Sequence, residues 1–238
     1  MKRMRLDKML AHSGFGSRKE VKVLIRQGLV KINGHVIRRV NHIVFPRSDS
    51  VYVDNMKVDY KEHHYIMLNK PSGVITSTKD RFSTTVIDIL GDGLKGLGLF
   101  PIGRLDKDTE GLLILTTDGK LAHQLLSPRN YVPKRYLATV DGIITSSDIE
   151  RFKHGIPLDE DFITLSSKLE IISPNSVYIT IYEGKFHQVK RMLKYIGRKT
   201  LYLKRVQMGK LKLDENLAPG EARELTDNEI ALLKSSVK

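Results

Sequence analysis

The hydrophobic pattern of the first sixty residues predicts a small domain of helices and hairpins. A helix is expected after the capping box of Ser17 and Glu20, because apolar residues recur at helical spacing from Val21 and Gly28 supplies a left-handed stop. Two hairpins are expected next: strands 30–32 and 35–37 turn at Asn33-Gly34, and strands 51–53 and 56–58 turn at Asp54-Asn55. The whole pattern is two short helices followed by short strands.

A polar stretch at 59–64 separates this segment from a larger, strand-rich one, which predicts two domains, 1–60 and 61–238. Apolar runs predict strands at 65–69, 112–116, 136–140, 169–172, 177–182 and 200–206. Helical spacing predicts helices at 119–126, 147–153, 187–196 and 227–234, the last after a capping box at Thr226 and Glu229. Because strands and helices do not alternate regularly, we expect an α+β fold around a mixed, mostly antiparallel sheet.

The charge of the chain indicates a polyanionic partner. The 238 residues include 40 Lys+Arg against 27 Asp+Glu, a net charge of +13. Residues 1–60 alone hold 13 basic and five acidic residues, so this quarter of the chain carries +8. Such an excess is typical of nucleic-acid-binding proteins and sometimes of proteins at acidic membranes, although solubility alone can also account for a basic chain.

The composition excludes several classes of chemistry. The chain has no cysteine, which rules out disulfides, thiolate metal sites, iron–sulfur clusters and cysteine nucleophiles. No apolar run approaches the ~18 residues of a membrane span. The start of the chain is basic, but Asp7, Lys8 and His12 interrupt its apolar stretch, unlike in a signal peptide. We therefore expect a cytoplasmic protein without membrane association.

Three generic motifs occur in the sequence, but their surroundings do not fit the binding sites that such motifs usually mark. The G-x-G-x-x-G pattern at 91–96 lacks the preceding strand and following helix of a dinucleotide site, so it predicts a flexible loop. The segment starting at Asp106 resembles a calcium loop, but its twelfth position is Thr117 instead of a glutamate. The eight histidines give no zinc-binding spacing. Neither a metal nor a cofactor is expected.

The segment 103–113 is a dense polar loop that runs directly into an apolar strand. Side chains on a loop held by rigid structure are well placed for chemistry. A salt-bridged turn would have the same composition, so spacing alone leaves both interpretations open.

The N-terminal segment resembles the alpha-L RNA-binding domain first seen in a small-subunit ribosomal protein. The resemblance covers about the first fifty residues and rests on R-L-D-K at 5–8, G-S-R at 16–18 and the stretch 25–34. It implies RNA contacts from the basic and capping residues of this domain, namely Arg5, Lys8, Ser17, Arg18, Lys19, Lys22, Arg26 and Lys31.

The second segment resembles the ribosomal small-subunit rRNA pseudouridine synthase family. Four motifs occur in the family's order: K-P-S-G at 70–73, G-R-L-D-K-D-T-E-G-L-L at 103–113, K-R-Y at 134–136 and E-G-K-F-H-Q-V-K-R-M at 183–192. The resemblance spans residues 65 to about 225 and resolves the loop at 103–113 in favour of catalysis.

The resemblance implies that Asp106 is the working carboxylate. It would act either as a nucleophile at C1′ of the target ribose or as a base at C2′, and the sequence leaves both routes open. Lys190 stands where the family has an arginine beside this carboxylate, so the positive charge is kept but the bidentate fork is lost. Arg191 is an alternative source of that charge.

The resemblance also implies how the uridine is held. Tyr136 is expected to stack on the target base, and Arg104 to contact phosphate or fill the gap left when the uridine is flipped out. Further RNA contacts are expected from Lys134, Gln188 and Arg191.

We expect the chain to isomerise a uridine of 16S rRNA, as a monomer acting on rRNA or on a precursor particle of the small subunit. The same chemistry on 23S rRNA is the alternative within the class. A non-catalytic ribosome assembly factor is the alternative outside it, although the presence of Asp106 and Tyr136 argues against loss of activity. A glycosidase is disfavoured because no second motif supplies a partner carboxylate.

Overall fold

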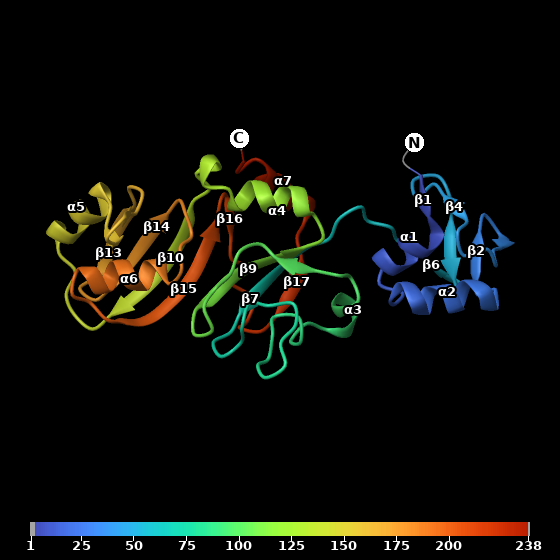
Figure 1. Cartoon of the computed structure of the whole chain (residues 1–238), viewed down its shortest axis with the longest axis horizontal. Helices are drawn as coiled ribbons and strands as arrows, with labels where there is room; N and C mark the ends of the chain where they lie inside the picture. The colour runs from blue at the N-terminus through green and yellow to red at the C-terminus, as the bar shows by residue number, and fades with distance from the viewer. Residues whose placement is uncertain (1–2, 238) are drawn as a thin grey trace. The chain divides into compact units, whose positions relative to one another are not determined.

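The computed structural model describes residues 3–237 and divides into two compact units (Figure 1). One unit comprises residues 1–64 with 90–99, and the other comprises residues 65–89 with 100–238. The expected α+β class is confirmed, since both units combine helices with mostly antiparallel sheets. No helix among the described residues is long and apolar enough to cross a membrane.

The first unit contains the predicted helices and hairpins. In chain order its elements are β1 (Met4–Arg5), α1 (Leu6–His12), α2 (Arg18–Gln27), β2 (Val30–Ile32), β3 (His35–Val36), β4 (Ile43–Val44), β5 (Val51–Val53), β6 (Met56–Lys57) and α3 (Asp92–Lys95). Strands β3-β2-β5-β6 form an antiparallel sheet, and β1 pairs with β4. Helices α1 and α2 contribute to one apolar core, in which Leu10 and Ile25 are fully buried.

Local signals account for these elements. The hydroxyl of Ser17 accepts from the amide of Glu20, whose carboxylate accepts in return from the amide of Ser17, so the predicted capping box is present. Gly28 ends α2 with φ of 79°. The segment 91–96, predicted as a loop, instead contains the single helical turn α3.

The second unit is organised around a nine-stranded sheet. Its main path runs β13-β14-β10-β15-β9-β7-β17, with β16 paired to β15 and β8 paired to β9. The bounds are β7 (Tyr65–Lys70), β8 (Phe100–Pro101), β9 (Glu110–Thr116), β10 (Lys134–Val140), β13 (Lys168–Ser173), β14 (Ser176–Ile181), β15 (Thr200–Met208), β16 (Leu211–Lys212) and β17 (Ala222–Glu224). All six predicted strands are present, each shifted by two residues at most at either end.

One pairing in this sheet is parallel and joins its two halves. β9 and β15 meet over two residue pairs, Glu110 with Lys204 and Gly111 with Arg205. The approach is very close at Gly111, where an added Cβ would lie 2.2 Å from the carbonyl oxygen of Arg205. Only glycine fits this position, because its φ of 97° also lies in the left-handed region.

Helices cover both halves of the sheet. Their bounds are α4 (Gly119–Leu126), α5 (Ser146–His154), α6 (Gln188–Tyr195) and α7 (Asp227–Lys234), with a 3₁₀ turn at Pro128–Asn130 and a small hairpin of β11 (Pro157–Asp159) and β12 (Phe162–Ile163). α4 and α7 lie side by side near β7 and β9 (Figure 1), where Leu125 and Leu233 join Met67 and Ile114 in one core. The other half of the sheet carries α5 and α6.

Candidate active site

A buried lysine fixes the polar loop that precedes β9. Lys70 lies at the end of β7 and is fully buried. Its ammonium donates to three main-chain carbonyls, those of Pro71 at 3.0 Å, Lys107 at 3.1 Å and Thr109 at 2.9 Å. Burial lowers the pKa of Lys70 to about 8, despite the nearby carboxylates, which act in the opposite direction. A single side chain therefore sets the path of residues 107–109.

A second anchor holds the loop from the other side. The Thr76 hydroxyl donates to the carbonyl of Leu105 at 2.8 Å and accepts from the amide of the same residue at 3.1 Å. The amide of Gly73 donates to the carbonyl of Lys107 at 2.8 Å. Asp106 thus lies between two residues whose main chains are fixed by the segment 70–76.

One cation is shared by two carboxylates of this loop. Lys190 Nζ lies 3.1 Å from Asp106 Oδ2 and 2.5 Å from Asp108 Oδ1. His187 Nε2 lies 3.6 Å from the other oxygen of Asp106. Burial opposes the charge of Lys190, but its bonds to Asp108 and Asp106 outweigh burial and raise the pKa of Lys190. The same bond from Lys190 lowers the pKa of Asp108.

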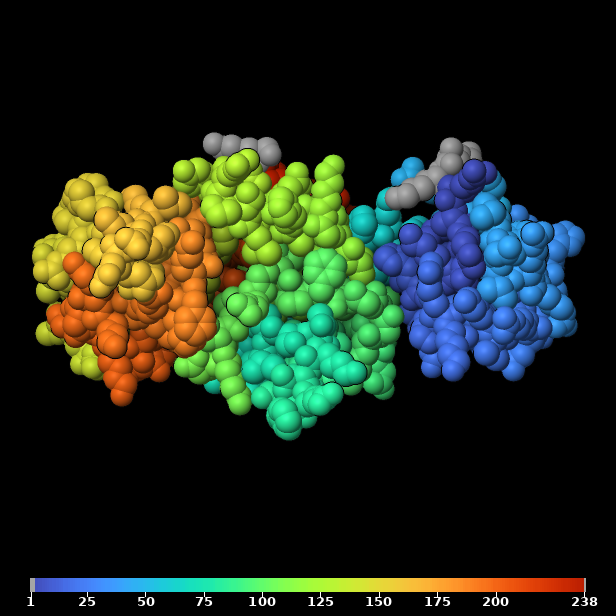
Figure 2. Space-filling view, viewed as in Figure 1, coloured from blue at the N-terminus to red at the C-terminus, as the bar shows by residue number. Residues whose placement is uncertain are grey.

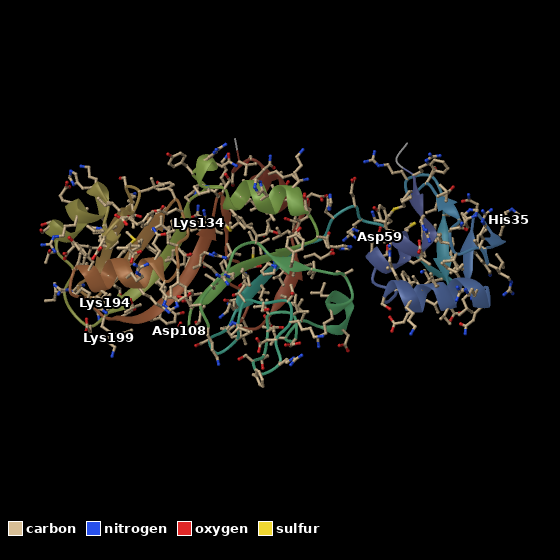
Figure 3. The ribbon with its side chains drawn as sticks, viewed as in Figure 1. His35, Asp59, Asp108, Lys134, Lys194 and Lys199 are labelled. Atoms are coloured by element: carbon tan, nitrogen blue, oxygen red, sulfur yellow. The ribbon has the colours of Figure 1, made fainter. Side chains whose placement is uncertain are left out.

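The second cation of the motif points elsewhere. Arg191 donates to the carbonyl of Leu158 at 2.6 Å and forms an ion pair with Asp159 of β11. The cation beside Asp106 is therefore Lys190, which α6 directs toward the loop (Figure 3 labels its other partner, Asp108).

The loop, β10 and the turn that precedes α6 line a cavity of about 880 Å³. Its wall includes Arg104, Asp106 and Tyr136, together with the turn 183–187. In Figure 2, the loop belongs to the green region of residues near 100–125, and the turn belongs to the orange region of residues near 175–195. A volume of this size suits a nucleotide-sized ligand.

The four residues expected to act in catalysis come together. Arg104, Asp106, Tyr136 and Lys190 all line one pocket, which opens beside α6. Tyr136 is 8% exposed, whereas Arg104 lies at the surface. Carboxylate, cation and aromatic ring are thus neighbours, although they come from three separate parts of the sequence.

The residues of this unit that were expected to contact RNA are more enclosed. Lys134 is 5% exposed and lines the cavity, with its ammonium donating to the carbonyl of Val132. Gln188 is 4% exposed and braces the turn before α6, since its amide donates to Glu183 and its carbonyl accepts from the amide of Lys185. Neither residue belongs to the open surface.

The residues of the first unit that were expected to contact RNA lie at its surface. Six are exposed: Arg5, Lys8, Arg18, Lys19, Arg26 and Lys31. Lys22 is half-buried, and the Ser17 side chain caps α2. Arg5 is held by Asp7 through two hydrogen bonds, and Lys31 donates to Asn55.

Two features of the site have weak sequence signals. Lys70 is marked by the K-P-S-G motif and by its place at the end of an apolar strand, but neither signal indicates its anchoring role. Arg205 on β15 is 3% exposed and lines the cavity, although its segment reads as an ordinary strand. Among residues 3–237, no group of three or more histidine, aspartate or glutamate side chains is placed to hold a metal ion.

Comparison with known proteins gives consistent matches. A family model described as RNA pseudouridylate synthase matches residues 64–195, and an S4 domain model matches residues 4–46. An uncharacterized RNA pseudouridine synthase of Bacillus subtilis is 47% identical over 97% of this chain and 98% of its own length. Ribosomal small subunit pseudouridine synthase A of Escherichia coli is 38% identical over 96% of this chain and 99% of its own. A crystal structure of a pseudouridylate synthase superposes with a TM-score of 0.69 at 37% identity, over 97% of this chain and 99% of that one.

Proposed function

Because this chain belongs to the RNA pseudouridylate synthase family and carries an S4 domain, we propose that it isomerises a uridine of 16S ribosomal RNA to pseudouridine. The small-subunit substrate is supported by the likeness to ribosomal small subunit pseudouridine synthase A along nearly the full chain. The observation that carries the catalytic assignment is Asp106, held 3.1 Å from Lys190 in the wall that also contains Tyr136.

The reaction needs an ionised carboxylate beside the ribose. The bond between N1 and C1′ breaks, the uracil turns, and a bond forms between C5 and C1′. The proton on C5 then leaves to a base and N1 gains a proton, so no atom is lost and no electron acceptor is needed. Asp106 either attacks C1′ or removes the C2′ proton, and in both cases it must carry its charge.

The surroundings of Asp106 supply a neighbouring cation and a fixed position. Lys190 supplies the compensating cation, and Lys70 and Thr76 hold the main chain on both sides. The uridine enters a cavity of about 880 Å³ after flipping out of its stack, with Tyr136 against the base. Arg104, at the surface of the same wall, contacts phosphate or fills the gap in the RNA.

The first unit supplies sequence-independent affinity. Its exposed Arg18, Lys19, Arg26 and Lys31 neutralise RNA phosphates. We further propose that the protein acts as a monomer, in the cytoplasm, on rRNA or on a small-subunit precursor particle.

The test uses ribosomal RNA carrying tritium at uridine C5. Wild-type protein should release tritium from 16S rRNA, and mapping the modified base identifies the nucleotide. Asp106→Asn should lose activity by several powers of ten, each tenfold being about 1.4 kcal/mol of barrier, because an amide is neither nucleophile nor base.

Asp108→Asn is the matched control in the same loop. Its side chain is 71% exposed and shares Lys190, so the variant should bind RNA and retain most of its activity. Release from 23S rRNA alone would move the substrate to the large subunit. Absence of release from either RNA would favour the non-catalytic assembly factor.

A further inference from the structure

A buried arginine in the cavity wall has unused hydrogen-bonding capacity. Arg205 is 3% exposed, and its Nε donates to the carbonyl of Leu112 at 2.8 Å. Its Nη2 is buried as well and finds no hydrogen-bond partner among residues 3–237. Burying a charged donor removes its hydrogen bonds to water, and this cost in folding free energy is not recovered when no acceptor replaces the water. Arg205 is therefore suited to an acceptor that arrives with a ligand.

The side chains of Arg205 and Tyr136 line the same cavity. The two residues are paired in register across β15 and β10. Directly opposed residues of an antiparallel pair project to the same face of the sheet, and both line the cavity that contains Asp106. An acceptor on a base stacked against Tyr136 would therefore lie near the guanidinium.

The wall around Arg205 is positively charged. Lys134, labelled in Figure 3, is buried nearby, and burial together with the charge of Arg205 lowers the pKa of Lys134 to about 8. The buried carboxylate nearby in this wall, Glu183, already accepts from the amide of Leu165 at 2.8 Å and from Gln188 at 3.1 Å. Of the charged side chains buried in this wall, two are thus cations, Lys134 and Arg205, and one is a carboxylate that is already hydrogen-bonded. This part of the cavity favours a group that is rich in oxygen or becomes negative.

We infer that Arg205 donates a hydrogen bond from Nη2 to a carbonyl oxygen of the target uracil and stabilises the charge that forms when the glycosidic bond breaks. This inference rests on the proposed function. When the bond between N1 and C1′ breaks, its electron pair stays on N1 and is delocalised onto the uracil oxygens. The charge disappears when C5 bonds to C1′. Both routes open to Asp106 pass through this uracil anion, so the role of Arg205 is the same in either.

The test compares the reduction in rate caused by replacing Arg205 for two different leaving groups. Transcripts are prepared with uridine or with 5-fluorouridine, whose fluorine withdraws electrons and makes the departing anion less basic. Loss of the original nucleoside is followed under single-turnover conditions with saturating enzyme, by digestion and mass spectrometry. With uridine, Arg205→Gln should be slower than wild type by about 100-fold or more, as for removal of an oxyanion donor. With 5-fluorouridine, the rate of Arg205→Gln should be reduced by a markedly smaller factor relative to wild type.

Two further variants keep the experiment decisive. Lys204→Gln removes a cation from the adjacent position of β15, outside the cavity, and should slow neither substrate. Arg205→Lys keeps the charge, should lose less than Arg205→Gln, and permits the same comparison if the glutamine variant does not fold. Circular dichroism and RNA affinity are measured for every variant.

Several outcomes would overturn the inference. An equal loss with both substrates would mean that Arg205 only supports the structure. Weaker RNA binding with an unchanged rate at saturation would assign it to phosphate. A normal rate in Arg205→Gln would remove it from the site. A wild-type protein inactive on both transcripts would instead overturn the proposed function, and the inference with it.

Discussion

Replacing Gly111 by alanine should damage both the stability and the activity of the second unit. Gly111 lies where β9 meets β15, with φ of 97°. An alanine Cβ would lie 2.2 Å from the carbonyl oxygen of Arg205 and 2.9 Å from its amide nitrogen. Since ordinary contact begins at 3.4 Å, the two strands would have to separate by about 1 Å.

The structure supplies a control that isolates the effect of crowding. Gly73 also has a left-handed backbone, with φ of 87°, but an added Cβ there would meet no atom within 4 Å. The backbone conformation alone should cost each alanine variant about 1–2 kcal/mol. Crowding should add roughly 1–3 kcal/mol at Gly111 and nothing at Gly73.

Urea unfolding followed by far-ultraviolet circular dichroism measures the difference. With a slope of about 2 kcal/mol per molar, the midpoint should fall by roughly 1–2.5 M for Gly111→Ala and by about 0.5–1 M for Gly73→Ala. Tritium release should fall further in Gly111→Ala, by about 100-fold, because β9 carries the loop with Asp106 and a shift of about 1 Å misplaces the carboxylate. Equal midpoints for the two variants would refute the argument that the close approach at Gly111 requires glycine.

Three further results are expected. Lys190→Arg should remain active in tritium release whereas Lys190→Met should lose most activity, because only arginine keeps a cation between the two loop carboxylates; a fully active methionine variant would contradict this role. Arg18→Gln combined with Lys19→Gln should lower the slope of log affinity against log salt by about 1.4, or about 0.7 for each phosphate that is no longer neutralised, and an unchanged slope would place the RNA elsewhere. The bond from Arg223 lowers the pKa of Glu229 to about 2, so the stabilisation that Glu229→Gln removes is fully present above about pH 4.5 and is lost as the pH falls toward 2; thermal melts of both proteins across this range should converge at the acid end.

The elements predicted correctly from the sequence are those set by neighbours along the chain. α2 follows from a capping box, the hairpin at residues 30–36 from Asn33-Gly34, and α4 from helical spacing. The two- and three-residue strands β8, β11, β16 and β17 were not predicted, because so few residues show no alternation. Their existence depends on a neighbouring strand.

The site shows the same division. The motifs indicated Asp106, Tyr136 and Lys190, which the fold brings to one pocket. The sharing of Lys190 with Asp108 and the burial of Lys134 depend on contacts between distant segments, which no local pattern encodes. The same holds for the parallel pairing of β9 with β15, which places Arg205 in the cavity.

The anchors of the catalytic loop have a consequence for how its sequence can change. Lys70 and Thr76 bind main-chain atoms of the loop, at residues 105, 107 and 109, and none of its side chains. Carbonyl groups are the same in every amino acid, so a substitution at Lys107 leaves its anchoring bond intact. Position and chemistry are therefore encoded in different segments of the chain. Residues next to Asp106 can therefore be substituted, which would change the preference of the enzyme for the surrounding RNA, while the carboxylate keeps the position that the reaction needs.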